Sequence, residues 1–136
     1  VESYVYWIGP DRTHQKVIEQ ALSCSKGNPR EAFDYLFHSM KVASFGRTAK
    51  FDYLTMLAKL HLAPIEAGSP YLSGSSGPLR GARLLFGGNV EATLRIKDLD
   101  DWLVELAADL KVDMQTIEDA LCNWQKSPEL FKPFRG

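Results

Sequence analysis

Apolar residues return every three or four positions along most of this chain, and that spacing restricts what the chain can fold into. It is clearest after Asp98, where one face of a helix would be buried while Asp101 faces water. That buried face would carry Leu99, Trp102, Leu103, Leu106, Ala107 and Leu110. Such a stripe has the period of an α-helix and not that of a strand. The same spacing occurs in two further sets: Phe33, Leu36, Phe37 and Met40, and Met114, Ile117, Leu121 and Trp124. The pattern predicts a mainly α-helical fold with little or no sheet.

Residues that start and stop helices indicate about six of them. Asn28 followed by Pro29 is a helix start, because Asn caps the free amides and Pro fits the first helical position. The expected helices cover residues 11–25, 29–43, 46–61, 79–86, 98–111 and 113–126. Two segments are expected to be extended: residues 1–8 form a short strand or arm, and residues 92–97 form an extended segment or a short strand before a helix capped by Asp98.

The length and composition fit one folded domain. The chain has 136 residues, of which 45% are apolar and 24% charged, and these values are ordinary for a globular protein. We interpret residues 1–136 as a single compact helical domain, or as the C-terminal part of a longer chain because Val1 is not Met. No apolar run approaches the roughly 18 residues of a membrane span, and Cys24 and Cys122 lie in helical patterns. We therefore expect reduced thiols and a cytoplasmic protein.

Charge is distributed unevenly along the chain. The net charge is −1, but residues 1–97 carry twelve basic and eight acidic residues while residues 98–136 carry four basic and nine acidic residues. The first part can therefore meet a polyanion, whereas the second part would repel one.

A glycine-rich segment within residues 71–85 is the most informative local feature. Gly74 and Gly77, small hydroxyl residues and Pro78 would leave backbone amides exposed at a helix N-terminus, where an anion is stabilised. Arg80 and Arg83 are three residues apart and would share a face of that helix. The segment predicts a phosphate site, with the alternative that Arg80 caps a carbonyl or pairs with an acidic residue of the helix over 99–111.

Other basic residues also stand near predicted helix starts. Arg47 and Lys50 do so, as do Arg12 and Arg30. Cations in a first turn oppose the helix dipole by about 0.3–1 kcal/mol each. Repeated use of this placement indicates that the helix starts receive an external anion, and Arg47 and Lys50 would extend the phosphate site.

Candidates for chemistry are few. Asp98 is either a catalytic carboxylate beside the glycine-rich hairpin or a helix cap, and the three histidines have no metal-ligand spacing with the cysteines. We expect no metal and no cofactor. A complete nucleotide-binding loop and a Ser nucleophile elbow are both absent from the sequence. Five aromatic residues could stack on an unpaired base or pack in the core: Tyr4, Tyr6, Trp7, Tyr53 and Tyr71.

The segment Leu72-Ser-Gly74-Ser-Ser-Gly77 resembles the glycine hairpin of the helix-hairpin-helix DNA glycosylases, which holds a DNA phosphate between two helices. In that superfamily an Asp about 20 residues later serves the chemistry at a flipped base, and Asp98 stands at a similar distance here. The hairpin is one residue longer than the family pattern.

Residues 45–54, Phe-Gly-Arg-Thr-Ala-Lys-Phe-Asp-Tyr-Leu, and residues 77–88 look like a bacterial and phage family, the α-glutamyl/putrescinyl thymine pyrophosphorylases. The resemblance covers about residues 28–125. It implies a glycosylase-related protein that acts on modified thymines in DNA.

Two functions remain open from the sequence. The first is a DNA-directed, glycosylase-like protein that grips phosphates and acts on a modified or flipped base. The alternative is a non-catalytic helical subunit that binds a protein partner in a bacterial, defence-type complex through its acidic third and aromatic ends. A small-molecule phosphate site is a third, minor possibility.

Overall fold

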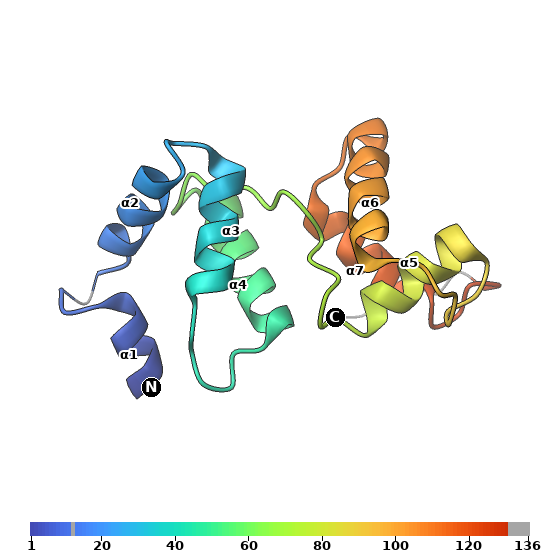
Figure 1. Cartoon of the computed structure of the whole chain (residues 1–136), viewed down its shortest axis with the longest axis horizontal. Coiled ribbons are helices and arrows are strands. Elements are labelled where there is room, and N and C mark those ends of the chain that lie inside the picture. The colour runs from blue at the N-terminus through green and yellow to red at the C-terminus, as the bar shows by residue number, and fades with distance from the viewer. Residues whose placement is uncertain (12, 131–136) are drawn as a thin grey trace. The chain divides into compact units, whose positions relative to one another are not determined.

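Helices account for the regular structure of the chain. A computed structural model describes residues 1–11 and 13–130, and within these residues there are seven helices and no strands. The helices are α1 (Glu2–Ile8), α2 (His14–Cys24), α3 (Pro29–Ser39), α4 (Arg47–Lys59), α5 (Gly77–Gly87), α6 (Ile96–Leu110) and α7 (Met114–Trp124) (Figure 1). The mainly α fold predicted from the sequence is confirmed. The chain divides into two units, Val1–Gly68 and Ser69–Gly136, and the single-domain organisation stays a prediction.

The first unit is built on α3 and α4. Phe33 and Phe51 are fully buried and meet edge to face, with ring centroids 6.1 Å apart. Asn28 caps α3 as predicted, since its side chain accepts hydrogen bonds from the amides of Arg30 and Glu31. α2 lies beside α3, where Ala21 is fully buried (Figure 1). The core of this unit therefore comes from the apolar stripe that the sequence placed on the second expected helix.

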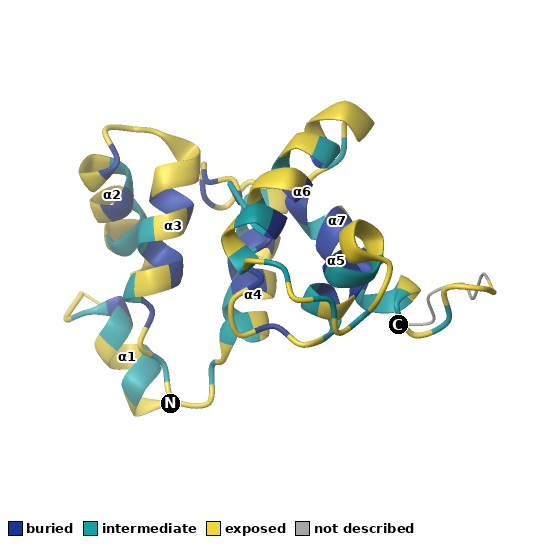
Figure 2. Cartoon of the chain, turned by 45° about the vertical axis from the view of Figure 1, so that its right-hand side comes forward, coloured by how far each residue is buried: buried dark blue, intermediate teal, exposed yellow. Residues whose placement is uncertain are grey.

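The second unit is built on the approach of α5 to α7. A Cβ added to Gly77 would lie 2.6 Å from the sulfur of Cys122, and one added to Gly81 would lie 2.5 Å from the carbonyl oxygen of Leu121. One turn of helix separates the two glycines, so both present bare backbone to the same face of α7. Figure 2 shows buried positions on α6 and α7. Leu103 of α6 and Leu121 of α7 are buried. Glycine therefore sets how closely these helices pack.

Three expectations about helix ends were wrong. Residues 2–8 form α1 instead of a strand. Tyr4, Tyr6 and Ile8 alternate as in a strand, but Tyr4, Trp7 and Ile8 also have helical spacing. α6 begins at Ile96, so Arg95 is its N-cap and Asp98 lies inside the first turn. No strand forms over residues 92–95.

The α6 face expected to be buried is only partly so. Leu99, Leu103 and Ala107 are buried, whereas Trp102 is 38% and Leu110 59% exposed. The helix packs along a narrower stripe than the pattern indicated, because α5 and α7 cover one side of it.

Replacing Gly81 by Ala should lower the free energy of unfolding by about 1–3 kcal/mol, although Ala is the better helix former by about 1 kcal/mol. The new methyl group would meet backbone atoms of Leu121 that cannot rotate away. Urea unfolding followed by circular dichroism measures the change. Gly46→Ala is the control, since its Cβ would meet nothing within 4 Å, and should lose less; a stabilised Gly81→Ala protein would contradict the close packing.

Candidate functional site

The N-terminus of α5 is open to a ligand. Ser76 is its N-cap, and within the described residues neither a side-chain cap nor an acidic residue occupies its first turn. The preceding turn is held in place: the amide of Leu72 donates to Asp100 Oδ1 at 3.1 Å, and Ser75 Oγ donates to the carbonyl of Leu72 at 2.8 Å. Ser73, Gly74 and Ser76 are left exposed. The turn therefore presents small polar groups at the positive end of a helix dipole.

Arg80 lies in the first turn of α5, beside this open end. Its Nη1 donates to Glu91 Oε1 at 2.8 Å, with both side chains largely in solvent, 48% and 64% exposed. The alternative prediction, that Arg80 pairs with an acidic residue of the helix over 99–111, is wrong. Its partner Glu91 lies in the segment before α6. An exposed pair of this kind contributes about 0–1 kcal/mol. The pair with Glu91 therefore holds Arg80 only weakly.

Arg83 lies on the same helix, one turn further. Its Nε is buried and has no hydrogen-bond partner among the described residues. A buried donor without an acceptor is unusual in a folded protein. Arg80 and Arg83 therefore differ, one paired at the surface and one partly buried.

Gly77, predicted to bind phosphate, has a structural role. Its α-carbon faces Cys122 of α7, so close helix packing accounts for this glycine without a ligand. Gly74 instead has a left-handed φ of 79°, which glycine adopts at no steric cost. The helix before this segment, α4, ends at Lys59, so α5 follows a long loop and a helix-hairpin-helix arrangement is not seen.

Asp98 is held by a neighbouring arginine. Arg95 Nε donates to Asp98 Oδ2 and Arg95 Nη2 donates to Asp98 Oδ1, both at 2.8 Å. The hydrogen bonds and charge of Asp98 raise the pKa of the Arg95 guanidinium. Asp98 is half-buried while Arg95 is exposed. The carboxylate is thus accessible to chemistry once the guanidinium moves away.

In the first unit, Arg47 and Lys50 lie in the first turn of α4. Gly46 is the N-cap of this helix, and no side chain caps it among the residues described. The Arg47 guanidinium lies 4.7 Å from the centroid of the Phe51 ring, and the Lys50 ammonium lies 5.8 Å from that of Phe37. Burial, and then the charge of Lys41, lower the pKa of Lys50.

Arg30 provides a contrast, and Arg12 lies outside the described residues. Arg30 starts a helix whose amides Asn28 already caps, and it pairs with Glu66 at 2.7 Å. Of the helix starts that the sequence singled out and the structure describes, those of α4 and α5 have no side-chain cap, and they lie in separate units.

The sequence did not single out a pocket in the first unit. A cavity of about 780 Å³ is lined by Tyr4, His14, Gln15, Ile18, Glu19, Leu22, Tyr53, Leu57, Leu62 and Pro64. The hydroxyl of Tyr4 is hydrogen-bonded to His14 Nε2 at 2.5 Å and lies 3.3 Å from the hydroxyl of Tyr53. Tyr4, Trp7 and Tyr53, noted in the sequence as an aromatic set, come together here. Reading residues 2–8 as a helix would have placed Tyr4 and Trp7 on one face.

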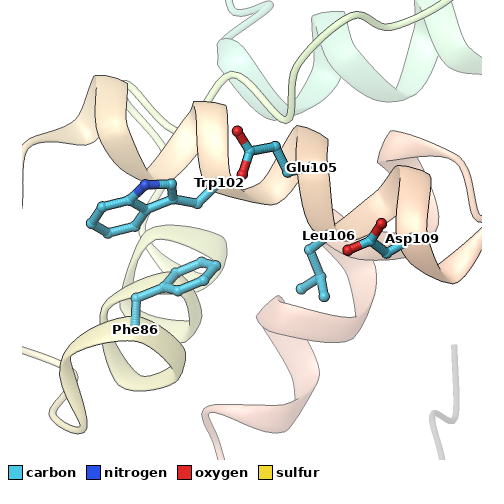
Figure 3. Close-up of a pocket in the computed structure, with 5 residues that line it drawn as sticks. All are labelled: Phe86, Trp102, Glu105, Leu106 and Asp109. Atoms are coloured by element: carbon cyan, nitrogen blue, oxygen red, sulfur yellow. The ribbon is translucent and has the colours of Figure 1, made fainter.

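A second pocket, of about 440 Å³, lies in the second unit and is shown in Figure 3. The rings of Phe86 and Trp102 face each other with centroids 5.2 Å apart, and both remain more than a third exposed. Glu105 and Asp109 line the same pocket from α6. These carboxylates would repel a phosphate, so this surface is unsuited to a nucleic-acid backbone.

Metal-binding clusters and membrane-spanning helices are both absent from the described part of the chain. No group of three or more His, Cys, Asp or Glu residues there could hold a metal ion. No helix there is long and apolar enough to cross a membrane.

The environment of Tyr53 should make the protein sensitive to alkali. Burial, and then the hydrogen bond with Tyr4, raise the pKa of Tyr53 above its usual value of 10.0. Since the folded state holds this proton more tightly, its stabilising effect is present below pH 10.0 and is lost as the pH rises beyond it. Urea unfolding at several alkaline pH values should show this loss, and Tyr53→Phe should reduce it; an equal loss in the variant would exclude Tyr53 as the cause.

Comparison with known proteins gives one match. The model of a family described as alpha-glutamyl/putrescinyl thymine pyrophosphorylase clade 3 matches residues 1–136. No curated protein and no solved structure matches the chain.

Proposed function

Because the chain belongs to the alpha-glutamyl/putrescinyl thymine pyrophosphorylase family, we propose that it binds DNA by the phosphate backbone and acts on a modified or flipped base. The family description names thymine and a pyrophosphoryl group. A protein with such a substrate must tolerate dense negative charge close to a base. The proposal therefore assigns two tasks to this chain, phosphate binding and chemistry at the base.

The open start of α5 is the observation that most supports phosphate binding. Its first turn has no acidic residue and no side-chain cap in the part of the chain described, and Arg80 stands beside it. A phosphate at this place would accept from backbone amides near Gly74 and Gly77 and from the Arg80 guanidinium. Arg83 is assigned to the same site, because its guanidinium lies one turn along the helix and already contains a donor without an acceptor.

Arg47 and Lys50 are assigned to a separate contact with the backbone. They lie at the start of α4, and their side chains rest on the rings of Phe51 and Phe37. Such rings limit the rotation of long side chains, so less entropy is lost when a phosphate binds. Burial lowers the pKa of Lys50 because it disfavours the charged ammonium. A phosphate bound nearby would stabilise that charge, so the ammonium has a reason to attract an anion.

Asp98 is assigned as the carboxylate that acts at the base. Carboxylates commonly serve as general bases, and a positioned one contributes about 10²–10⁴-fold to a rate. In the resting protein Arg95 occupies both oxygens of Asp98. Binding of DNA phosphate by the exposed Arg95 would release Asp98 for this task.

The phosphate site is tested by DNA binding at several salt concentrations, measured by fluorescence anisotropy with a labelled duplex. Arg80→Gln should weaken binding and reduce the slope of log affinity against log salt by about 0.9 in magnitude, as expected for one lost phosphate contact. Glu91→Gln should strengthen binding, because it removes the carboxylate that competes for Arg80.

Arg30→Gln is the matched control for Arg80→Gln. It removes the same charge from the first turn of a helix, but from one that is already capped and paired with Glu66. Its salt slope should stay close to that of the unaltered protein. Equal effects of the two substitutions would show a general charge effect and would contradict a site at α5.

The role of Asp98 is tested by Asp98→Asn. DNA rich in modified thymine is incubated with the protein, digested and analysed by mass spectrometry of its nucleosides. The variant should convert the modified base roughly 100-fold more slowly or worse, while its DNA affinity is retained. Asp101→Asn, an exposed position on the same helix, is the control; wild-type conversion by Asp98→Asn would remove Asp98 from the mechanism.

A second candidate function is binding of a protein partner. It is supported by the exposed rings of Phe86 and Trp102, since exposed aromatic residues are enriched at interfaces. The acidic side chains beside them, Glu105 and Asp109 (Figure 3), would select a basic partner surface. Trp102→Ala and Arg80→Gln together separate the two candidates: loss of binding to a basic partner protein in Trp102→Ala alone supports the protein interface, whereas loss of DNA binding in Arg80→Gln alone supports the DNA site.

A further inference from the structure

A pocket in the first unit combines an apolar floor with a hydrogen-bonding corner. The floor consists of aliphatic residues, Ile18, Leu22, Leu57, Leu62 and Pro64. Its volume of about 780 Å³ lies within the roughly 300–1,000 Å³ of pockets that hold small organic molecules. A largely apolar pocket with a few convergent polar groups is typical of small-molecule sites.

The polar corner is formed by three linked side chains. The Tyr4 side chain lies between His14 and Tyr53. Its hydroxyl oxygen is 2.5 Å from His14 Nε2 and 3.3 Å from the Tyr53 hydroxyl oxygen. The Tyr53 hydroxyl is protonated near neutral pH, as tyrosine ordinarily is, so it can both donate and accept a hydrogen bond. These side chains can therefore form hydrogen bonds with a ligand whose edge carries both hydrogen-bond donors and acceptors.

Helix packing holds this corner in place. Tyr4 comes from α1, His14 from α2 and Tyr53 from α4. Trp7 contacts both tyrosines, with centroid distances of 5.9 Å to Tyr4 and 6.4 Å to Tyr53. Phe45, from the loop that precedes α4, packs edge to face on the ring of Tyr53. The hydroxyls are therefore positioned before any ligand arrives.

The charge of the lining limits what can bind. None of the described lining residues is Lys or Arg, and Glu19, which accepts a hydrogen bond from Gln15 at 2.8 Å, is the acidic one among them. An anionic ligand would lose its hydration without gaining a counter-charge. An uncharged, planar molecule would bury its faces on the aliphatic floor and satisfy its edge at the corner.

We propose that this pocket binds an uncharged, planar nitrogen heterocycle the size of a nucleoside, held at its edge by Tyr4, His14 and Tyr53. The pocket lies within Val1–Gly68, whereas the phosphate site proposed at α5 lies outside it. The two sites are therefore tested by different substitutions, and the pocket does not depend on DNA binding.

The test is ligand-observed NMR of the full chain with thymidine or deoxyadenosine, and with thymidine monophosphate as the charged probe. The nucleosides should bind, and the added phosphate should weaken binding. Tyr4→Phe should weaken nucleoside binding roughly threefold to tenfold, the effect of one hydrogen bond. Leu62→Arg, at a lining position that is 62% exposed, should weaken it further by crowding the apolar floor.

Tyr35→Phe is the matched control. It removes one hydroxyl, bonded to Gln20 at 3.2 Å, that does not line the pocket, and it should leave binding unchanged. Arg80→Gln should also leave nucleoside binding unchanged, whatever it does to DNA binding. The proposal is overturned if neither nucleoside binds at millimolar concentration, if the monophosphate binds more tightly, or if Tyr4→Phe and Leu62→Arg bind as the unaltered protein does.

Discussion

The contact of α5 with α7 is the constraint on which the second unit depends. Gly77 and Gly81 allow the backbones to meet at a distance that no side chain permits. This contact fixes the axis of α5, and with it the direction of its free amides and of Arg80. The hydrogen bond from the Leu72 amide to Asp100 fixes the turn that precedes them. Packing and a possible anion site thus share the same few residues.

The sequence predicted the helical fold because apolar period and capping chemistry are local. Phe33, Leu36 and Met40 are buried where the stripe placed them, and Asn28 caps α3. The first eight residues were misjudged because Tyr4, Tyr6 and Ile8 alternate while Tyr4, Trp7 and Ile8 have helical spacing, and the segment is too short to decide between the two periods. The exposure of Trp102 was missed because it depends on which side of α6 the neighbouring helices cover, and periodicity carries no such information.

The candidate sites were predictable to different degrees. Basic residues at open helix starts follow from sequence, and Arg80 and Arg47 stand at such starts. The partner of Arg80 did not follow, because Glu91 reaches it from a loop. The sequence also could not tell the two roles of glycine apart. A glycine can serve a left-handed backbone conformation, as Gly74 does, or close helix packing, as Gly77 does, and only the position of the neighbouring helix α7 distinguishes them. The Tyr4, His14 and Tyr53 group required three helices to be placed in space.

The position of Cys122 has a practical consequence. Its sulfur lies beneath Gly77, where not even a methyl group would fit, and the thiol is unpaired. Cys122 is only partly buried, so a thiol reagent can reach it from the side that α5 leaves open. An adduct on that sulfur would lie against the first turn of α5, so labelling of Cys122 should loosen the contact of α5 with α7.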